Sequence, residues 1–511
     1  MVSSIRSGSV VGVDGVLISV EVDITPGMPG FNIVGLPENA VKESRDRVVP
    51  AIKNSGFQIP PRKITVNLAP ADLRKEGTLF DLPIAIAILK AYGYVKGSTD
   101  YLVIGELSLD GYVREVKGVL PIALTLKRAR ELKGIILPFR NRYEAALVGD
   151  INVYPVRDLR ETVLFLNGET EIAEVRLDST DIFNNGLSDE VDFKDVRGQE
   201  HAKRAMEVAA AGGHNVLMVG PPGSGKTMLA RRLPTILPPM TLDEALETTK
   251  IHSVAGILPV DNPLVSIRPF RAPHHTISDM GLVGGGANPR PGEVSLAHNG
   301  VLFLDELPEF SRNVLEVLRQ PLEDGHVVIT RAKTSVSYPS KFMLIAAMNP
   351  CPCGYLGDPY HQCTCAYSSI LKYRSRISGP LLDRIDIQIE VPALKYEHLR
   401  DVNAGEGSKE IRERVQRARE IQLKRFAGRR GIYCNAHMDS RLIREYCKID
   451  DKTEEVLKRA IEKFGFSART YFRVLKVART IADLGGKEEI DTPCIQEAIH
   501  YRTLDKRDAL R

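Results

Sequence analysis

The sequence lacks the features that mark a membrane-spanning, repetitive or strongly charged chain. Its longest candidate apolar run, 82–89, is far short of the ~18 apolar residues that a membrane-spanning helix needs. It has no internal repeat, no low-complexity tract and no basic-plus-apolar leader at residues 1–5, so we expect a cytoplasmic protein without a membrane partner. The formal net charge over 511 residues is only +4, so any nucleic-acid surface must be local. An apolar content of 43% is ordinary for a soluble globular protein, and the length allows three domains.

Composition divides the chain into four regions. Residues 1–165 alternate strand-like runs with helical runs, and residues 166–195 are acidic and polar with no apolar period, as in a linker. Residues 196–395 hold the motifs described below. Residues 396–511 are helical, and they follow a glycine-rich joint at 403–407 with Ser408 as the expected N-cap. In the first region we expect strands at 16–22, 64–68 and 134–137 and helices at 81–92 and 120–132.

The most informative stretch fits the phosphate-binding pattern G-x-x-x-x-G-K-[ST]. An apolar run at 215–219 precedes it and a helical run at 228–233 follows it, which is the strand–loop–helix context that this loop requires. Backbone N–H groups at the start of the helix favour phosphate, Lys226 can reach the terminal phosphates, and Thr227 can hold Mg²⁺. We therefore predict an ATP-binding loop formed by Gly220, Pro221, Pro222, Gly223, Ser224, Gly225, Lys226 and Thr227.

Two further apolar runs end in residues that suit ATP hydrolysis. The run 301–304 is typical of a buried parallel strand, and the next residues are Asp305, which can hold Mg²⁺, and Glu306, which can polarise the attacking water. The run 342–348 stops at Asn349, whose amide suits a position between the γ-phosphate and the water. A turn asparagine before Pro350 is the alternative interpretation.

Two arginines follow these strands. Arg384 is a surface residue in the simplest interpretation, but at a neighbour's ATP site it would make hydrolysis depend on assembly. Ser467 begins an amphipathic helix that could bring Arg469 from a lid onto the phosphates.

The motifs at 268–276, 284–286, 289–300, 305–310, 349–354 and 379–386 resemble those of the ComM/YifB family. That resemblance covers nearly the whole chain and implies an α/β fold with a P-loop AAA+ core of the magnesium-chelatase-like group. The core, with a parallel sheet, would be 196–395 and a helical lid 396–511. It also implies a ring, expected as a hexamer, and a hairpin at 325–338 that turns near Ala332 and faces the pore.

The resemblance assigns roles to single residues. Asp305 and Glu306 would be the Walker B pair, Asn349 the first sensor, Arg384 the arginine finger and Arg469 the second sensor.

Residues 1–165 resemble the α+β fold of the Lon protease C-terminal domain, which is the ribosomal S5 domain 2-like fold. In that comparison Leu79 stands at the nucleophile position and Ile122 at the lysine position. Because an apolar pair cannot form a nucleophile and base, we expect the fold without peptidase activity.

Four of the seven cysteines form two C-x-C pairs, Cys351 with Cys353 and Cys363 with Cys365. Two interpretations stay open, a structural Zn²⁺ site and four free thiols. His361 is a spare ligand candidate. His274 and His275 stand without thiols or carboxylates beside them, which favours a structural or pore-facing role.

Basic residues concentrate in two places. One lid helix carries Lys409, Arg412, Arg414, Arg417, Arg419, Lys424, Arg425, Arg429 and Arg430. Two interpretations stay open for this helix: a solvated face, or a surface that contacts a DNA backbone. The hairpin tip and the polar insert contribute Arg331, Lys333, Arg268, Arg271 and Arg290, which favour a polyanion in the pore.

Two function classes remain. The resemblance implies a ring-shaped ATPase that remodels DNA, by branch migration or helicase activity, in homologous recombination or natural transformation. The alternative is a chelatase-like remodeller of a protein or metal-insertion complex. We expect the DNA motor, with ATP and Mg²⁺ as cofactors, Zn²⁺ if the cysteines bind it, and single-stranded or branched DNA as partner.

Overall fold

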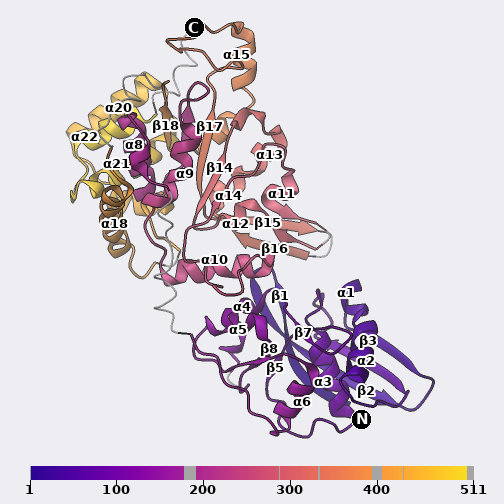
Figure 1. Cartoon of the computed structure of the whole chain (residues 1–511). Coiled ribbons are helices and arrows are strands. Elements are labelled where there is room, and N and C mark those ends of the chain that lie inside the picture. The colour runs from indigo at the N-terminus through magenta and orange to yellow at the C-terminus, as the bar shows by residue number, and fades with distance from the viewer. Residues whose placement is uncertain are drawn as a thin grey trace. The chain divides into compact units, whose positions relative to one another are not determined.

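The computed structural model describes residues 2–129, 131–177, 191–286, 288–331, 334–393, 405–429 and 431–502. These residues pack into two units (Figure 1). The first unit comprises Met1–Asn185, Leu242–Ser266 and Thr330–Tyr338, and the second comprises Gly186–Thr241, Ile267–Ile329 and Pro339–Arg511. Among the described residues, no helix is both long enough and apolar enough to cross a membrane.

The first unit is built on a mixed seven-stranded sheet in the order β3-β4-β2-β1-β5-β8-β9. β2 pairs antiparallel with β1 and β4, and the other neighbours run parallel. The strands are β1 (Val2–Val11), β2 (Asp14–Thr25), β3 (Gly30–Val34), β4 (Lys63–Ala69), β5 (Leu102–Val103), β8 (Ile135–Pro138) and β9 (Val153–Val156), with a small hairpin of β6 (Glu106–Leu107) and β7 (Val113–Arg114). All three strands expected in this region are present.

The helices of this unit are α1 (Asn39–Lys42), α2 (Ser44–Asn54), α3 (Asp81–Ala91), α4 (Val119–Leu126), α5 (Arg142–Ala146) and α6 (Leu159–Leu166). α3 confirms the expected helix at 81–92 and packs against β1 and β2. α4 is shorter than expected, because the exposed Lys127 and Arg128 end its apolar face. Leu79 and Ile122 both lie in the apolar core. The unit is therefore α+β, and its kinship with the Lon-type fold stays a prediction.

Two segments that the sequence assigns to the ATPase region, Leu242–Ser266 and Thr330–Tyr338, belong to the first unit instead. Helix α10 (Leu242–Ala255) contacts α4. The Ser253 hydroxyl donates to Glu144 Oε1 at 2.5 Å, and the Gly118 N–H donates to the Ser253 carbonyl at 3.1 Å. Burial raises the pKa of Glu144, while hydrogen bonds from the Ser253 hydroxyl and the Leu120 N–H oppose the shift. The segment Leu242–Ser266 is thus anchored by buried polar contacts as well as by apolar packing.

The second unit contains a five-stranded parallel sheet in the order β11-β14-β17-β10-β18. Its strands are β11 (Phe270–Arg271), β14 (Val301–Leu304), β17 (Met343–Met348), β10 (Val216–Val219) and β18 (Ile387–Glu390). β10, β14 and β17 confirm the three strands expected around the ATP motifs. Their side chains are almost all buried, as a parallel sheet covered on both faces requires.

Helices and short elements surround this sheet. They are α8 (Glu200–Gly212), α9 (Lys226–Ile236), α11 (Asp279–Val283), β12 (Gly284–Gly285), β13 (Arg290–Pro291), α12 (Glu293–Leu296), α13 (Arg312–Val317), α14 (Arg319–Asp324), α15 (Tyr367–Arg374) and α16 (Gly379–Leu382). The expected hairpin is present as β15 (His326–Arg331), most of which belongs to the second unit, and β16 (Thr334–Pro339), most of which belongs to the first. Its expected turn at Ala332 lies outside the described residues.

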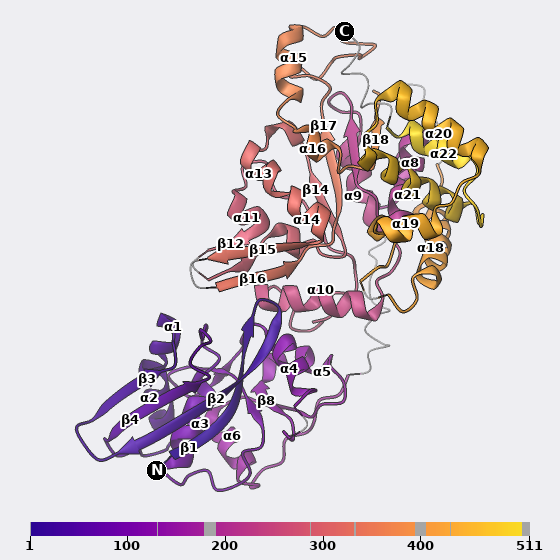
Figure 2. The same ribbon diagram turned by 180° about the vertical axis from the view of Figure 1, so that it is seen from behind.

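The C-terminal helices gather beside α8 in the second unit (Figure 2). They are α18 (Ser408–Arg425), α19 (Ser440–Tyr446), α20 (Asp451–Phe464), α21 (Ala468–Leu484) and α22 (Thr492–His500), and they share one hydrophobic core with α8 and α9. Ser467 caps α21, as its sequence predicts. Gly407 rather than Ser408 is the N-cap of α18, because the Asp192 carboxylate accepts the Ser408 N–H at 2.8 Å and so supplies the missing cap.

Candidate nucleotide-binding site

Three motifs meet at one edge of the parallel sheet. The phosphate-binding loop follows β10, the acidic pair follows β14 and Asn349 follows β17. β17 lies between β14 and β10, and all three run in the same direction. Since ligands of open parallel sheets bind at the carboxyl ends of the strands, this edge is the expected place for a nucleotide.

Lys226 begins α9, and its side chain folds back over the loop. The Lys226 Nζ donates to the carbonyls of Gly220 and Pro221 at 2.7 and 2.8 Å, and it lies 3.3 Å from Asn349 Oδ1. Burial lowers the pKa of Lys226, while the charge of Asp305 opposes that shift. The ammonium group therefore lies between the phosphate-binding loop and the end of β17, held by neutral acceptors that an anionic ligand can replace.

Thr227 and Asp305 come together although 78 positions separate them. The Thr227 hydroxyl donates to Asp305 Oδ2 at 2.7 Å. A hydroxyl and a carboxylate oxygen at this distance are the ligand types that Mg²⁺ takes beside nucleotide phosphates. The structure thus assembles the residues that the sequence analysis assigns to Mg²⁺.

The loop needs glycine at two positions for different reasons. Gly225, the N-cap of α9, has φ +87°, a conformation that L-residues rarely adopt. A Cβ on Gly220 would lie 2.1 Å from the Val391 carbonyl oxygen. The sequence analysis missed a further support of this loop: Gln199 Nε2 donates to the Ser224 carbonyl at 2.6 Å. Gln199 is 25 positions away, outside the motif, so the spacing of the motif gives no signal for it.

Glu306 points into a more open environment than Asp305. Its side chain is 57% exposed, and its backbone has φ +53°, which is uncommon for a residue other than glycine. Its carboxylate Oε2 lies 3.5 Å from His275 Nδ1. His275 also packs against His274 and against the ring of Phe310. The histidine pair, expected to be structural or pore-facing, therefore brings one ring to the carboxylate assigned to the attacking water.

Arg384 and Arg469 share one partner, Glu323 at the end of α14. Arg384 is 5% exposed and pairs with Glu323 through one guanidinium nitrogen, while another donates to the Pro380 carbonyl at 2.7 Å. Arg469 is more exposed and lies 3.3 Å from the other Glu323 oxygen. Hydrogen bonding from Arg384 leads the effects that lower the pKa of Glu323. Both arginines are thus placed at Glu323, a residue that the sequence analysis did not identify.

Several basic residues expected at a polyanion surface are used inside the second unit. Arg268 donates to the carbonyls of Pro238 and Asn299, both at 2.7 Å, and Arg271 forms a bidentate pair with Glu293 at 2.6 and 2.7 Å. Arg290 is exposed, whereas Lys333 and the side chain of Arg331 lie outside the described residues. Of the insert arginines, Arg290 is the one that the structure leaves available for an external anion.

Basic residues of the lid helix are likewise used in contacts inside the second unit. The buried Arg419 donates to the carbonyls of Ala210 and Ala211 at the end of α8, which satisfies groups that a helix terminus leaves unpaired. Arg414 pairs with Glu207 at 2.5 Å, and Arg425 pairs with Asp483 at 2.6 and 2.8 Å. Arg414 and Arg419 therefore hold this helix to α8, Arg425 holds it to α21, and Arg430 lies outside the described residues.

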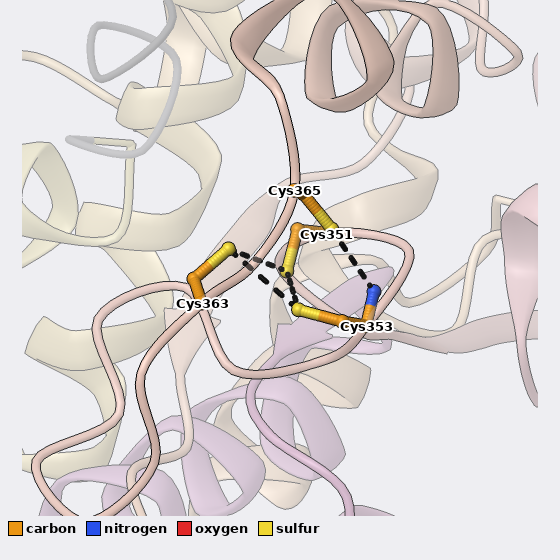
Figure 3. A group of neighbouring side chains, drawn as sticks. All are labelled: Cys351, Cys353, Cys363 and Cys365. Carbon is orange, nitrogen blue, oxygen red and sulfur yellow. Dashed lines mark hydrogen bonds between the residues drawn. The ribbon is translucent and has the colours of Figure 1, made fainter.

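The cysteines of the two C-x-C pairs converge in one group, on the segment that follows Asn349 (Figure 3). Their sulfur atoms all lie within 4.8 Å of one another, and Cys351 lies 3.4 Å from Cys353 and 3.7 Å from Cys363. His361 is not part of this group, because its ring stacks on Tyr355 and its Nδ1 lies 3.4 Å from Asp358. Cys434, Cys447 and Cys494 are buried apart from the cluster, as expected of core residues.

The parallel sheet, with a phosphate-binding loop and an acidic pair at one edge, defines a P-loop protein of the magnesium-chelatase type. The family described as "Magnesium chelatase, subunit ChlI" matches residues 192–399, "Subunit ChlI of Mg-chelatase" matches 20–141, and "Magnesium chelatase, subunit ChlI C-terminal" matches 405–502. The chain is also 25% identical over 177 residues to the magnesium-chelatase 38 kDa subunit of Cereibacter sphaeroides. This match covers 31% of this chain and 52% of that protein.

Similarity over the full length of the chain identifies its family more narrowly. The chain is 46% identical over 510 residues to "Competence protein ComM" of Haemophilus influenzae, covering 98% of this chain and 97% of that protein. It is 43% identical over 508 residues to "Uncharacterized protein YifB" of Escherichia coli, with 99% and 97% covered. The chain belongs to the ComM/YifB family.

Proposed function

We propose that this protein is a ring-forming AAA+ ATPase that couples ATP hydrolysis to the remodelling of DNA. The observation that carries the ATPase part is the meeting of Lys226, Thr227, Asp305 and Asn349 at one edge of the parallel sheet. These residues fit MgATP, because they offer a cation for the phosphates and a hydroxyl–carboxylate pair for the metal ion.

Each residue has a distinct role in that site. Lys226 would exchange the loop carbonyls for phosphate oxygens, and Thr227 and Asp305 would hold Mg²⁺, which would neutralise charge on the phosphates. Glu306 orients the attacking water and accepts its proton. Asn349, as a neutral amide beside Lys226, positions the water and the γ-phosphate without adding charge.

Arg384 is our candidate for the residue that acts on a neighbouring subunit. To do so it must leave Glu323, so ring assembly would exchange a carboxylate partner for the γ-phosphate of the neighbour. Glu323 also pairs with Arg469, the candidate second sensor. Release of Glu323 on ring assembly would therefore free both arginines together. An arginine placed in this way contributes about 10³–10⁵ in rate in other NTPases.

Two lines support DNA as the remodelled substrate. The Haemophilus relative is named a competence protein, and competence is the uptake of DNA. Arg290, exposed on the small β12–β13 hairpin, offers a cation to a polyanion. The second candidate, a chelatase-like remodeller of a protein complex, is supported by the three chelatase families that match the chain.

The rate of ATP hydrolysis distinguishes the two candidates. It is measured for the full chain with no DNA and with single-stranded, duplex or branched DNA of equal nucleotide concentration. We expect stimulation by single-stranded or branched DNA, and a smaller slope of DNA affinity against salt for Arg290→Ala because one phosphate contact is lost. Equal rates with and without every DNA, together with no DNA binding at low salt, would refute the DNA proposal and leave the chelatase-like alternative.

A further inference from the structure

The arrangement of the four cysteines matches the dimensions of a tetrahedral metal site. With Zn–S bonds of about 2.3 Å, tetrahedral geometry separates the sulfurs by roughly 3.8 Å. The separations 3.4 Å (Cys351–Cys353), 3.7 Å (Cys351–Cys363) and 3.6 Å (Cys353–Cys363) lie close to that value. All four sulfurs lie within 4.8 Å of one another, so one ion can contact each of them.

Backbone N–H groups face every one of these sulfur atoms. Cys351 faces the N–H groups of Gly354 and Leu356, and Cys353 faces those of Tyr355 and Thr364. The Cys353 N–H donates to Cys365 Sγ at 3.4 Å, and the Cys365 N–H faces Cys363. Hydrogen bonds to sulfur stabilise the thiolate form, which is the form that ligates a metal, and they orient the ligands as outer-shell partners do.

The cluster joins two pieces of chain that both contact the proposed sensor. Cys351 follows Asn349 by two residues, and Cys365 precedes helix α15 by two residues. From α15, Tyr373 accepts the backbone N–H of Asn349, and Arg374 Nε donates to the Pro350 carbonyl at 3.1 Å. Residues 351–366 contain no helix or strand, so no regular hydrogen-bonding pattern joins the two pieces.

The same turn also contacts the phosphate-binding loop. A Cβ on Gly354 would lie 2.6 Å from Pro222 Cδ and 3.9 Å from Asn349 Cγ. Gly354 has φ +88°, and its N–H donates to the Cys351 carbonyl at 3.0 Å, which closes a turn around the Cys351–Cys353 pair. A displacement of this turn therefore reaches both Pro222 and Asn349.

We propose that Cys351, Cys353, Cys363 and Cys365 bind one Zn²⁺ as a tetrathiolate, and that this ion positions Asn349 and the Pro222 side of the phosphate-binding loop for ATP hydrolysis. The four cysteines are its ligands, and the ion acts on the reaction only through Asn349 and the loop. Closed four-cysteine sites are structural zinc sites, since no coordination position is left for a substrate. The positioning role rests on the proposed ATPase function, whereas the zinc site does not.

The test begins with metal content. The full chain, purified without chelator, is analysed for Zn, Fe and Co by elemental analysis, and the expected result is about one zinc per chain. The double variant Cys363→Ser with Cys365→Ser should contain none, while Cys494→Ala, which removes a buried cysteine outside the cluster, should keep its zinc. Protein refolded or exchanged with Co²⁺ should show thiolate-to-cobalt charge-transfer absorption and tetrahedral d–d bands.

Zinc removal should then separate nucleotide binding from hydrolysis. Loss of zinc should weaken the binding of a fluorescent ATP analogue far less than it lowers kcat, which should fall by about 10²-fold, the cost of misplacing a reacting group by about 1 Å. Because the double variant could lose its fold, a second measurement uses wild-type protein whose zinc is released by a mercurial and restored with thiol and Zn²⁺. Activity should fall and return in step with bound zinc.

The outcomes are distinct. Free thiols, disulfides or iron in place of zinc would overturn the site. Full kcat in zinc-free protein would overturn the positioning role. Zinc at one per chain in a wild-type protein that hydrolyses no ATP would refute the proposed ATPase and leave the metal site standing.

Discussion

Replacing Lys226 with alanine is the most direct perturbation of the nucleotide site. Lys226 is 8% exposed, and its ammonium contacts neutral oxygens of the loop and of Asn349. Bound ATP would turn these contacts into a desolvated ammonium–phosphate pair. Removing one partner of a buried charge pair costs ~3–5 kcal/mol. At ~1.4 kcal/mol per tenfold change, Lys226→Ala should weaken ATP binding by roughly 10²- to 4 × 10³-fold.

The assay is a titration with a fluorescent ATP analogue in the presence of Mg²⁺. Lys203→Ala is the matched control, because Lys203 is a lysine of similar exposure, 5%, whose Nζ pairs with Glu200 of helix α8 at 3.1 Å rather than with the phosphate-binding loop. The control should bind ATP as wild type does. The assignment of Lys226 to the phosphates would be refuted if Lys226→Ala bound the analogue within a factor of two of wild type while remaining folded.

Three further predictions concern hydrolysis, assembly and stability. Glu306→Gln should bind ATP with wild-type affinity and lower kcat by at least about 10², because the amide cannot accept the proton of the water; wild-type turnover would show that another residue does so. Arg384→Ala should keep ATP binding, lose hydrolysis, and regain partial activity when mixed with Glu306→Gln protein, since some interfaces then combine an intact carboxylate with an intact arginine; no recovery in mixed oligomers would contradict action between subunits. Asp483→Ala should lower the free energy of unfolding by ~3–5 kcal/mol in urea, because it removes the buried carboxylate that pairs with the partly buried Arg425 and with the buried Arg479; the exposed pair formed by Glu455 should lose less than ~1 kcal/mol on Glu455→Ala, and an equal loss from both would refute this account of the C-terminal helices.

The local motifs were predictable from sequence because each is a short pattern with one structural solution. A strand, a glycine-rich turn and a helix dictate the position of Lys226, and the apolar run that ends at Asp305 can only be a buried strand in this context. The meeting of Thr227 with Asp305 follows from parallel strands whose carboxyl ends share an edge. The two C-x-C pairs likewise led us to expect that their four cysteines lie close together, as they do.

The rest depends on long-range partners that no local pattern encodes. Glu323 lies 61 positions before Arg384 and 146 before Arg469, so its pairing with both arises only from the fold. The basic residues of the insert and lid illustrate the same limit: a helix face rich in arginine looks alike whether its partners are water, DNA or the carbonyls at the end of α8. Packing of the segment Leu242–Ser266 in the first unit was equally hidden, because an apolar helix face does not specify which neighbour covers it.

The central claim, an ATPase that works as an assembly, is tested most directly by the rate of ATP hydrolysis per chain as a function of protein concentration. The measurement uses the full chain with Mg²⁺ and is accompanied by sedimentation at each concentration. We expect a rate per chain that rises as oligomers form and then reaches a plateau. A rate that is independent of concentration in a protein that remains monomeric throughout, or no hydrolysis by the assembled protein, would contradict the account.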